Sequence, residues 1–75
     1  MKRKAIIISL LSSTLTSYER KIIKKEKPWG IILFKRNIIS AQQIIKLIKS
    51  IKEIAKDKKF PILIDEEGGR VTRLS

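Results

Sequence analysis

Three short, nearly continuous apolar runs constrain the fold of this chain more than any other feature. They occupy residues 5–11, 31–34 and 62–64 and are rich in isoleucine. A strand with one solvated face alternates apolar and polar residues, whereas these runs do not. They therefore predict strands buried on both faces, which is typical of a parallel sheet covered by helices.

The segments between the apolar runs carry signals for helix starts. Thr16 precedes Glu19 by three residues, and Ser40 precedes Gln43 by the same interval. This is the spacing of a capping box, in which two side chains satisfy each other's otherwise unpaired backbone N–H groups. The first helix is predicted to end near residue 26, before Pro28, and the second near residue 58.

Each predicted helix has an apolar face with a helical repeat. The predicted inner face of the first helix consists of Leu15, Tyr18, Ile22 and Ile23. The predicted inner face of the second consists of Ile44, Ile45, Leu47, Ile48, Ile51, Ile54 and Ala55. The chain thus has the order β-α-β-α-β, and parallel strands joined this way require right-handed crossovers. Three such strands leave exposed edges, so the sequence predicts part of a larger α/β fold.

The formal net charge of +11 raises the possibility of a nucleic acid or an anionic membrane as partner. The thirteen lysines are, however, spread along the chain, and residues 61–75 carry a net charge of −1. A solvated lysine-rich surface is the favoured interpretation. A small basic nucleic-acid-binding protein stays an alternative, although the aromatic residues are scattered, and Trp29 and Phe34 are predicted to be core. A structural or interaction module is a second alternative.

The chain contains neither cysteine nor histidine, which excludes several kinds of site. Disulfides, thiolate metal sites and histidine-dependent nucleophilic triads cannot form within it. We expect no metal and no cofactor. The basic residues at positions 2–4 before an apolar run mimic a secretory signal, but Ser9 interrupts the run and no cleavage pattern follows, so a buried strand is favoured. No run is long enough to cross a bilayer.

Residues 65–73 hold the most specific polar sequence, directly after the third predicted strand. Ligands of parallel α/β folds bind at the carboxyl ends of strands. Asp65 and Glu67 would share a face about 6.5 Å apart, which suits a glycosidase carboxylate pair. Alternatively, the acidic residues pair with Arg70 and Arg73 and order a Gly-Gly turn. Spacing alone does not decide between these interpretations.

Residues 62–73, Ile-Leu-Ile-Asp-Glu-Glu-Gly-Gly-Arg-Val-Thr-Arg, closely resemble the D-x-E-G-G-R-V-x-R segment of bacterial β-N-acetylglucosaminidases (β-N-acetylhexosaminidases) in glycoside hydrolase family 3. Residues 30–37 resemble the G-x-I-L-F-x-R-N strand and loop of the same family, and Leu15-Thr16 with Glu19 resembles the start of its first helix. The resemblance is collinear over most of the chain.

The resemblance implies a TIM (β/α)8 barrel, of which this chain would form the first three parallel strands and two helices. Residues 1–75 would be the amino-terminal part of that domain, truncated before the catalytic residues. The implied activity is retaining hydrolysis that releases terminal N-acetylglucosamine from peptidoglycan fragments, in cytoplasmic cell-wall recycling. The implied partner is an N-acetylglucosamine-containing saccharide or muropeptide, with no nucleic acid and no membrane, and a second polypeptide could complete the barrel.

The resemblance also assigns residue roles. Asp65 and Arg73 match positions that hydrogen-bond sugar hydroxyls, so both are expected to bind substrate rather than to catalyse. The family's nucleophile is an aspartate on a later strand and its acid/base is a histidine on a mobile loop, and neither position exists among these 75 residues. No catalytic residue is therefore assigned here, and the chain alone is expected to be inactive.

Overall fold

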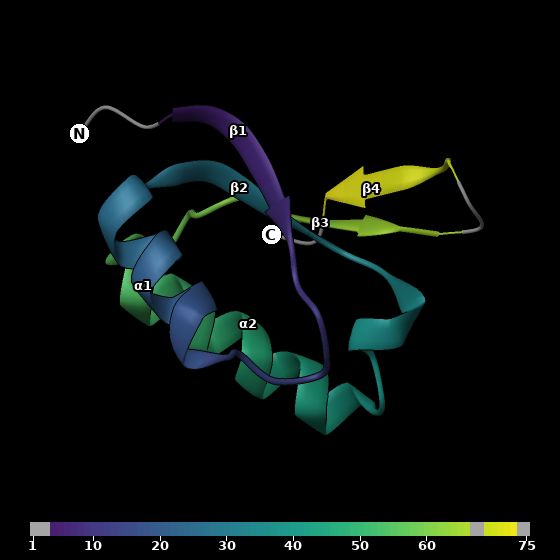
Figure 1. The fold of residues 1–75 in the computed structure, drawn as a ribbon. Helices are drawn as coiled ribbons and strands as arrows, with labels where there is room; N and C mark the ends of the chain where they lie inside the picture. The colour runs from purple at the N-terminus through teal and green to yellow at the C-terminus, as the bar shows by residue number, and fades with distance from the viewer. Residues whose placement is uncertain (1–3, 67–68, 74–75) are drawn as a thin grey trace.

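A computed structural model of the chain describes residues 4–66 and 69–73 (Figure 1). It contains two α-helices, one 3-10 helix and four strands among these residues. In chain order they are β1 (Lys4–Ser9), α1 (Ser17–Glu26), β2 (Pro28–Leu33), the 3-10 helix (Lys35–Asn37), α2 (Ala41–Ala55), β3 (Ile62–Asp65) and β4 (Val71–Arg73).

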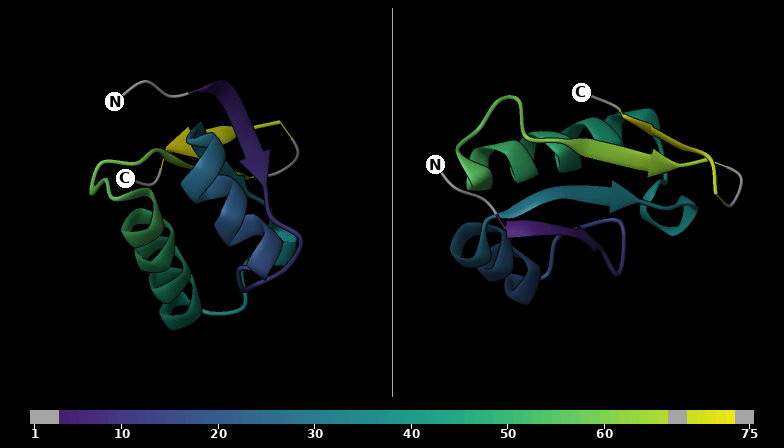
Figure 2. Two further views of the ribbon diagram at one scale, coloured as in Figure 1. Left: turned by 60° about the vertical axis from the view of Figure 1, so that its left-hand side comes forward. Right: turned by 90° about the horizontal axis from the view of Figure 1, so that it is seen from above.

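The strands form one sheet in the order β1-β2-β3-β4. β1, β2 and β3 are parallel, as predicted, and both helices lie on one side of the sheet (Figures 1 and 2). The predicted β-α-β-α-β order and the α/β class are confirmed. β4 was not predicted: it pairs antiparallel with β3 and makes the sheet mixed. Three residues are too few to show a strand period in sequence.

Both predicted capping boxes are present. Thr16 Oγ1 accepts from the Glu19 N–H at 3.1 Å, and Glu19 Oε1 accepts from the Thr16 N–H at 2.8 Å. At the start of α2, Ser40 Oγ accepts from the Gln43 N–H at 3.1 Å, while Gln43 Oε1 accepts from the Ser40 N–H at 3.5 Å. The helix starts were therefore predictable from three-residue spacings alone.

Each helix ends at a lysine in the left-handed conformation. Lys27 follows α1 with φ of 49°, and Lys56 follows α2 with φ of 55°. The turn at Lys56 ends α2 at Ala55, earlier than the predicted residue 58. A Cβ is disfavoured in this conformation, for which glycine is the usual residue.

Lys27→Gly and Lys56→Gly are each expected to stabilise the chain by about 0.5–1 kcal/mol, because they relieve the Cβ contact at a helix end. Urea unfolding followed by circular dichroism measures the change. The matched control is Lys21→Gly, which places glycine inside α1 and is expected to cost about 1 kcal/mol. Equal destabilisation by all three variants would show that the Cβ of Lys27 and Lys56 does not destabilise the two helix ends.

The hydrophobic core lies between the sheet and the two helices. Its buried members are Leu10, Ile23, Ile31, Leu33, Leu47, Ile51, Phe60 and Ile62. The predicted inner face of α1 is partly wrong: Tyr18 is 71% exposed, whereas the neighbouring Glu19 is only 7% exposed. Glu19 faces inward because its Oε2 also accepts from the Leu11 N–H at 2.9 Å. Trp29, which was predicted as barrel core, is 43% exposed in this structure, while Phe34 is half-buried.

Gly30 allows β2 to approach the residue before β3 closely. A Cβ at position 30 would lie 2.9 Å from the Pro61 carbonyl oxygen, which is closer than real Cβ atoms come to backbone. That same oxygen accepts from the Ile31 N–H at 3.1 Å. A glycine at this position within β2 thus allows the parallel pairing of β2 with β3, which begins at Ile31.

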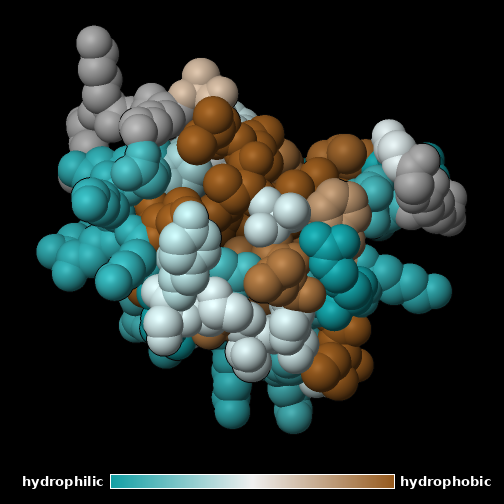
Figure 3. Space-filling view, viewed as in Figure 1, coloured by the Kyte–Doolittle hydropathy of each residue, from teal (hydrophilic) through white to brown (hydrophobic). Residues whose placement is uncertain are grey.

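Part of the apolar surface of the sheet is exposed. Figure 3 shows hydrophobic residues gathered over the strands, with hydrophilic residues around the helices. The exposed large apolar side chains on the strands are Ile6, Ile7, Trp29 and Val71. Helices cover only one face of the sheet. In the described residues, apolar strand surface therefore stays exposed.

Candidate functional site

The carboxyl ends of β1, β2 and β3 meet at one edge of the sheet, because the three strands are parallel. Leu10, Phe34 and Asp65 lie at or directly after these ends. In parallel α/β folds this edge is where ligands bind, since the loops there vary without disturbing the sheet. The polar residues of the three loops are thus the candidate site.

Asp65 is the last residue of β3 and is half-buried. Its Oδ1 accepts from the Gly69 N–H at 2.8 Å, which orients the carboxylate at the strand end. Gly69 has φ of 122°, a conformation that favours glycine, so the turn into β4 depends on this residue. Among the described residues Oδ2 has no hydrogen-bond partner, and a carboxylate oxygen of this kind can accept from a ligand hydroxyl.

Arg73 is the last residue of β4 and is exposed. Asp65 pairs with Val71 and Leu63 pairs with Arg73, so Asp65 and Arg73 are diagonal neighbours on one face of the ladder, roughly 7–8 Å apart. The side chains do not converge, because Arg73 Nη2 donates to the Lys59 carbonyl at 3.4 Å, before the amino end of β3. The structure therefore brings the two positions together but directs the guanidinium away from Asp65.

The neighbouring polar residues order the β3–β4 turn. The Glu66 N–H donates to the Arg70 carbonyl at 2.6 Å, and Thr72 Oγ1 donates to Glu66 Oε2 at 2.8 Å. Asp65 and Glu66 thus bind a backbone amide and a hydroxyl rather than the predicted arginine side chains. Thr72 pairs with Ile64, on the face opposite Asp65, as expected for Glu66. Glu67, the other predicted carboxylate of a pair, lies outside the described residues.

A buried asparagine joins the loops after β1 and β2, and sequence reasoning assigned it no role. Asn37 has no exposed surface. Its Oδ1 accepts from the Phe34 N–H at 2.8 Å, while Nδ2 donates to the carbonyls of Leu10 at 3.1 Å and Ser12 at 2.7 Å. The Leu10 and Ser12 carbonyls lie 27 and 25 residues before Asn37, whereas the Phe34 N–H lies three residues before it. Asn37 therefore satisfies backbone groups in both loops. In the sequence, Asn37 was marked only by its position in residues 30–37, the segment that resembles the family's strand and loop.

Gln43 extends this connection. Its Nε2 donates to the carbonyls of Ser13 at 2.7 Å and Asn37 at 2.9 Å, and its Oε1 accepts from the Ile39 N–H at 2.8 Å. Gln43 therefore acts both in the capping box of α2 and as a link to the loop after β1. Asn37 and Gln43 together form what we call the loop clasp. It fixes the positions of two of the three loops at the candidate site.

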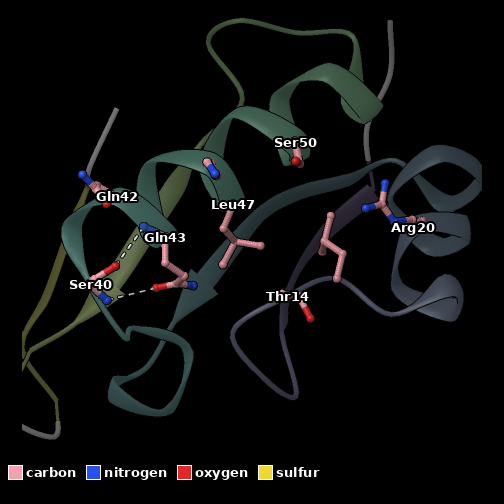
Figure 4. A pocket seen from close by; sticks show the side chains of 9 residues that line it. Thr14, Arg20, Ser40, Gln42, Gln43, Leu47 and Ser50 are labelled. Carbon is pink, nitrogen blue, oxygen red and sulfur yellow. Dashed lines mark hydrogen bonds between the residues drawn. The ribbon is translucent and has the colours of Figure 1, made fainter.

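A cavity of about 380 Å³ lies between α1 and α2 (Figure 4). Its lining residues are Thr14, Leu15, Arg20, Ser40, Gln42, Gln43, Lys46, Leu47 and Ser50. Gln43 belongs to the loop clasp, but neither Asp65 nor Arg73 lines this cavity. The cavity is thus a groove on the helical side of the molecule and is separate from the candidate site.

The described residues contain no group of three or more acidic, cysteine or histidine side chains that could hold a metal ion. Within the same residues, neither helix is long and apolar enough to cross a membrane.

Bacterial β-hexosaminidases are similar to this chain in sequence, although no family model matches it. The protein of Stenotrophomonas maltophilia (strain K279a) is 37% identical over 68 residues. Those of Glaesserella parasuis serovar 5 (strain SH0165) and Xylella fastidiosa (strain M12) are 38% and 34% identical over the same length. Each match covers 91% of this chain and 20% of the relative. The chain therefore spans about a fifth of the length of these relatives.

The fold is similar to that of NagZ from Neisseria gonorrhoeae. The native NagZ structure matches with a TM-score of 0.75 and 31% identity, over 97% of this chain and 21% of that one. The NagZ complex with N-trifluoroacetyl-D-glucosamine matches with a TM-score of 0.75 and 32% identity, over 95% and 21% of the two chains. Sequence and fold thus select the same relatives, and the resemblance indicated by residues 30–37 and 62–73 is confirmed.

Proposed function

We propose that this relative of the family 3 β-N-acetylglucosaminidases forms part of a TIM barrel and supplies a sugar-binding wall to a retaining glycoside hydrolase. The substrate is a saccharide with a terminal N-acetylglucosamine, as in a peptidoglycan fragment or muropeptide, and the setting is cytoplasmic cell-wall recycling. Asp65 and Arg73 bind sugar hydroxyls. The nucleophile and the acid/base come from segments beyond these residues, either in the same protein or on a second polypeptide.

One observation carries the proposal most directly. Asp65 lies at the carboxyl end of β3 with one carboxylate oxygen fixed by Gly69, in a fold similar to a protein that has been crystallised with an N-acylated glucosamine. A carboxylate held by a backbone amide is preorganised to accept from a hydroxyl without losing further side-chain freedom.

A chimera tests the proposal, in which this chain replaces the matching 68 residues of the Stenotrophomonas maltophilia β-hexosaminidase. We expect the chimera to hydrolyse a chromogenic β-N-acetylglucosaminide but not the corresponding β-glucoside. The 75-residue chain alone is expected to give no turnover, because binding groups without a nucleophile and an acid cannot form the covalent intermediate.

Two results would contradict the proposal. The first is a chimera that has a cooperative thermal transition but no hydrolase activity. The second is turnover by the isolated chain that Asp65→Asn abolishes, since that result would make Asp65 a catalytic group.

A further inference from the structure

The groove between α1 and α2 is positively charged. Arg20 of α1 and Lys46 of α2 both line it, and Figure 4 shows Arg20 across the groove from the residues of α2. Among the described residues that line it, none is acidic. Glu19, the neighbour of Arg20, is turned inward by its bonds to backbone amides. The two cations therefore share one hollow without a carboxylate that balances them.

The polar side chains of the groove have donors that the fold does not use. Within the part of the chain that the structure describes, the side chains of Arg20 and Lys46 have no hydrogen-bond or ion-pair partner, and neither do the hydroxyls of Thr14 and Ser50. Ser50 is half-buried in the middle of α2, where a serine is less favourable than an apolar residue. The groove thus offers a ligand two positive charges and hydroxyl donors besides.

The groove also has the size and the floor of a small-molecule site. Its volume of about 380 Å³ lies within the range of about 300–1,000 Å³ that is typical of such sites. Leu47 is buried, and Leu15 packs against the core, so both supply apolar surface between the polar groups. An apolar floor beside two cations suits an anionic group that is attached to an organic portion.

A phosphomonoester matches these groups better than a carboxylate does. At neutral pH it carries a charge of about −1.5 to −2 and three strong acceptor oxygens, whereas a carboxylate has a single charge and two oxygens. The planar fork of Arg20 can donate to two phosphate oxygens at once, and the ammonium of Lys46 adds a point charge from the facing helix. One cation from each helix thus balances one dianion.

We propose that the groove between α1 and α2 binds a small phosphomonoester, with the phosphate between Arg20 and Lys46 and the organic group over Leu15 and Leu47. The site is separate from the sugar-binding residues and does not depend on the proposed function. A ligand that contacts both helices stabilises the folded chain by mass action, because the unfolded chain has no such groove.

The test is a titration of the 75-residue chain with phenyl phosphate at constant ionic strength, with chemical shifts followed by NMR. We expect saturable shifts that are largest for the residues lining the groove. Arg20→Met and Lys46→Met are each expected to weaken the binding of phenyl phosphate about three- to tenfold, and the double variant about ten- to a hundredfold. Arg20→Lys keeps the charge without the fork and is expected to retain part of the affinity.

The matched control is the double variant Lys21→Met and Lys49→Met. It removes two charges from the same two helices at positions that do not line the groove, and it is expected to weaken binding less than about twofold. Phenyl phosphate is expected to raise the melting temperature of the unsubstituted chain and of this control, but not that of the variant lacking Arg20 and Lys46. Circular dichroism melts without ligand show that each variant folds.

Benzoate tests the chemical class of the ligand, since it carries a carboxylate on the same ring. It is expected to bind about fivefold more weakly than phenyl phosphate, or weaker still. Equal binding of benzoate, or no saturable binding of phenyl phosphate, would overturn the phosphomonoester site. A loss of affinity in the control as large as that in the groove variant would overturn it too, because it would assign the attraction to the net charge of the whole chain. The proposed function would stand in each case.

Discussion

Asp65→Ala is expected to lower kcat/KM for a β-N-acetylglucosaminide by about ten- to several-hundredfold in the Stenotrophomonas chimera. A hydrogen bond to a charged group contributes about 1.5–3 kcal/mol, and its loss also leaves a substrate hydroxyl unpaired in a desolvated site. The turn into β4 adds to the loss, because the Gly69 N–H loses its acceptor. Steady-state kinetics with a chromogenic substrate measure the effect.

Glu66→Ala is the matched control for Asp65→Ala. Glu66 is the next residue, is exposed, and accepts from Thr72 on the other face of the ladder. We expect Glu66→Ala to lower the melting temperature slightly and to leave kcat/KM nearly unchanged. An equal loss of kcat/KM in Glu66→Ala with no loss of stability would show that the assignment of Asp65 and Glu66 to opposite faces of β3 is wrong.

Arg73→Ala is the companion variant and is expected to lower kcat/KM to a similar extent. The guanidinium must first leave the Lys59 carbonyl, and at 3.4 Å that hydrogen bond is long and easily exchanged. Unchanged kinetics in Arg73→Ala would assign this side chain to the contact with Lys59 rather than to sugar.

Asn37→Ala is expected to lower the free energy of unfolding of the chain by about 3–5 kcal/mol. The substitution leaves the Ser12 carbonyl and the Phe34 N–H without their partner in or near the interior, while the Leu10 carbonyl keeps only Arg36 Nε, and each buried unsatisfied group costs about 1–3 kcal/mol. Such a loss is a large part of the stability of a domain of this size. Urea unfolding with circular dichroism detection measures it.

The control for Asn37→Ala is Gln42→Ala, at an exposed position near the start of α2. Surface substitutions of this kind change stability by about 0.5 kcal/mol or less. Asn37→Asp keeps the acceptor for the Phe34 N–H but removes both donor contacts, and it is expected to be strongly destabilising as well. A loss below about 1 kcal/mol in Asn37→Ala would mean that water or relaxed backbone replaces the loop clasp.

The helix starts, the three parallel strands and the location of Asp65 were predictable because each depends on local sequence. Capping spacings and apolar runs involve residues only a few positions apart. The inner face of α1 was predicted wrongly because the inward turn of Glu19 depends on the Leu11 amide, eight residues away. The loop clasp depends on contacts over 25 to 30 residues, which no local pattern encodes.

The site itself was predictable only in part, for the same reason. The position of Asp65 follows from the end of an apolar run, whereas the direction of the Arg73 side chain depends on the antiparallel pairing of β4. Arg36 and Asn37 stood in a recognisable segment, but their contacts with Leu10 became visible only when β1 and β2 were placed side by side.

The antiparallel pairing of β4 has a consequence for the order in which such a sheet can assemble. β4 occupies the edge of β3 at Leu63, Ile64 and Asp65, and its pairing spans only a short loop. Short hairpins close within microseconds, whereas a parallel neighbour must wait for a long crossover to be ordered. Any parallel strand that joins β3 at this edge must therefore compete with β4 for the same backbone groups. Among the described residues, no strand pairs with the outer edge of β1. The two edges of the sheet therefore differ in how readily they accept a new strand.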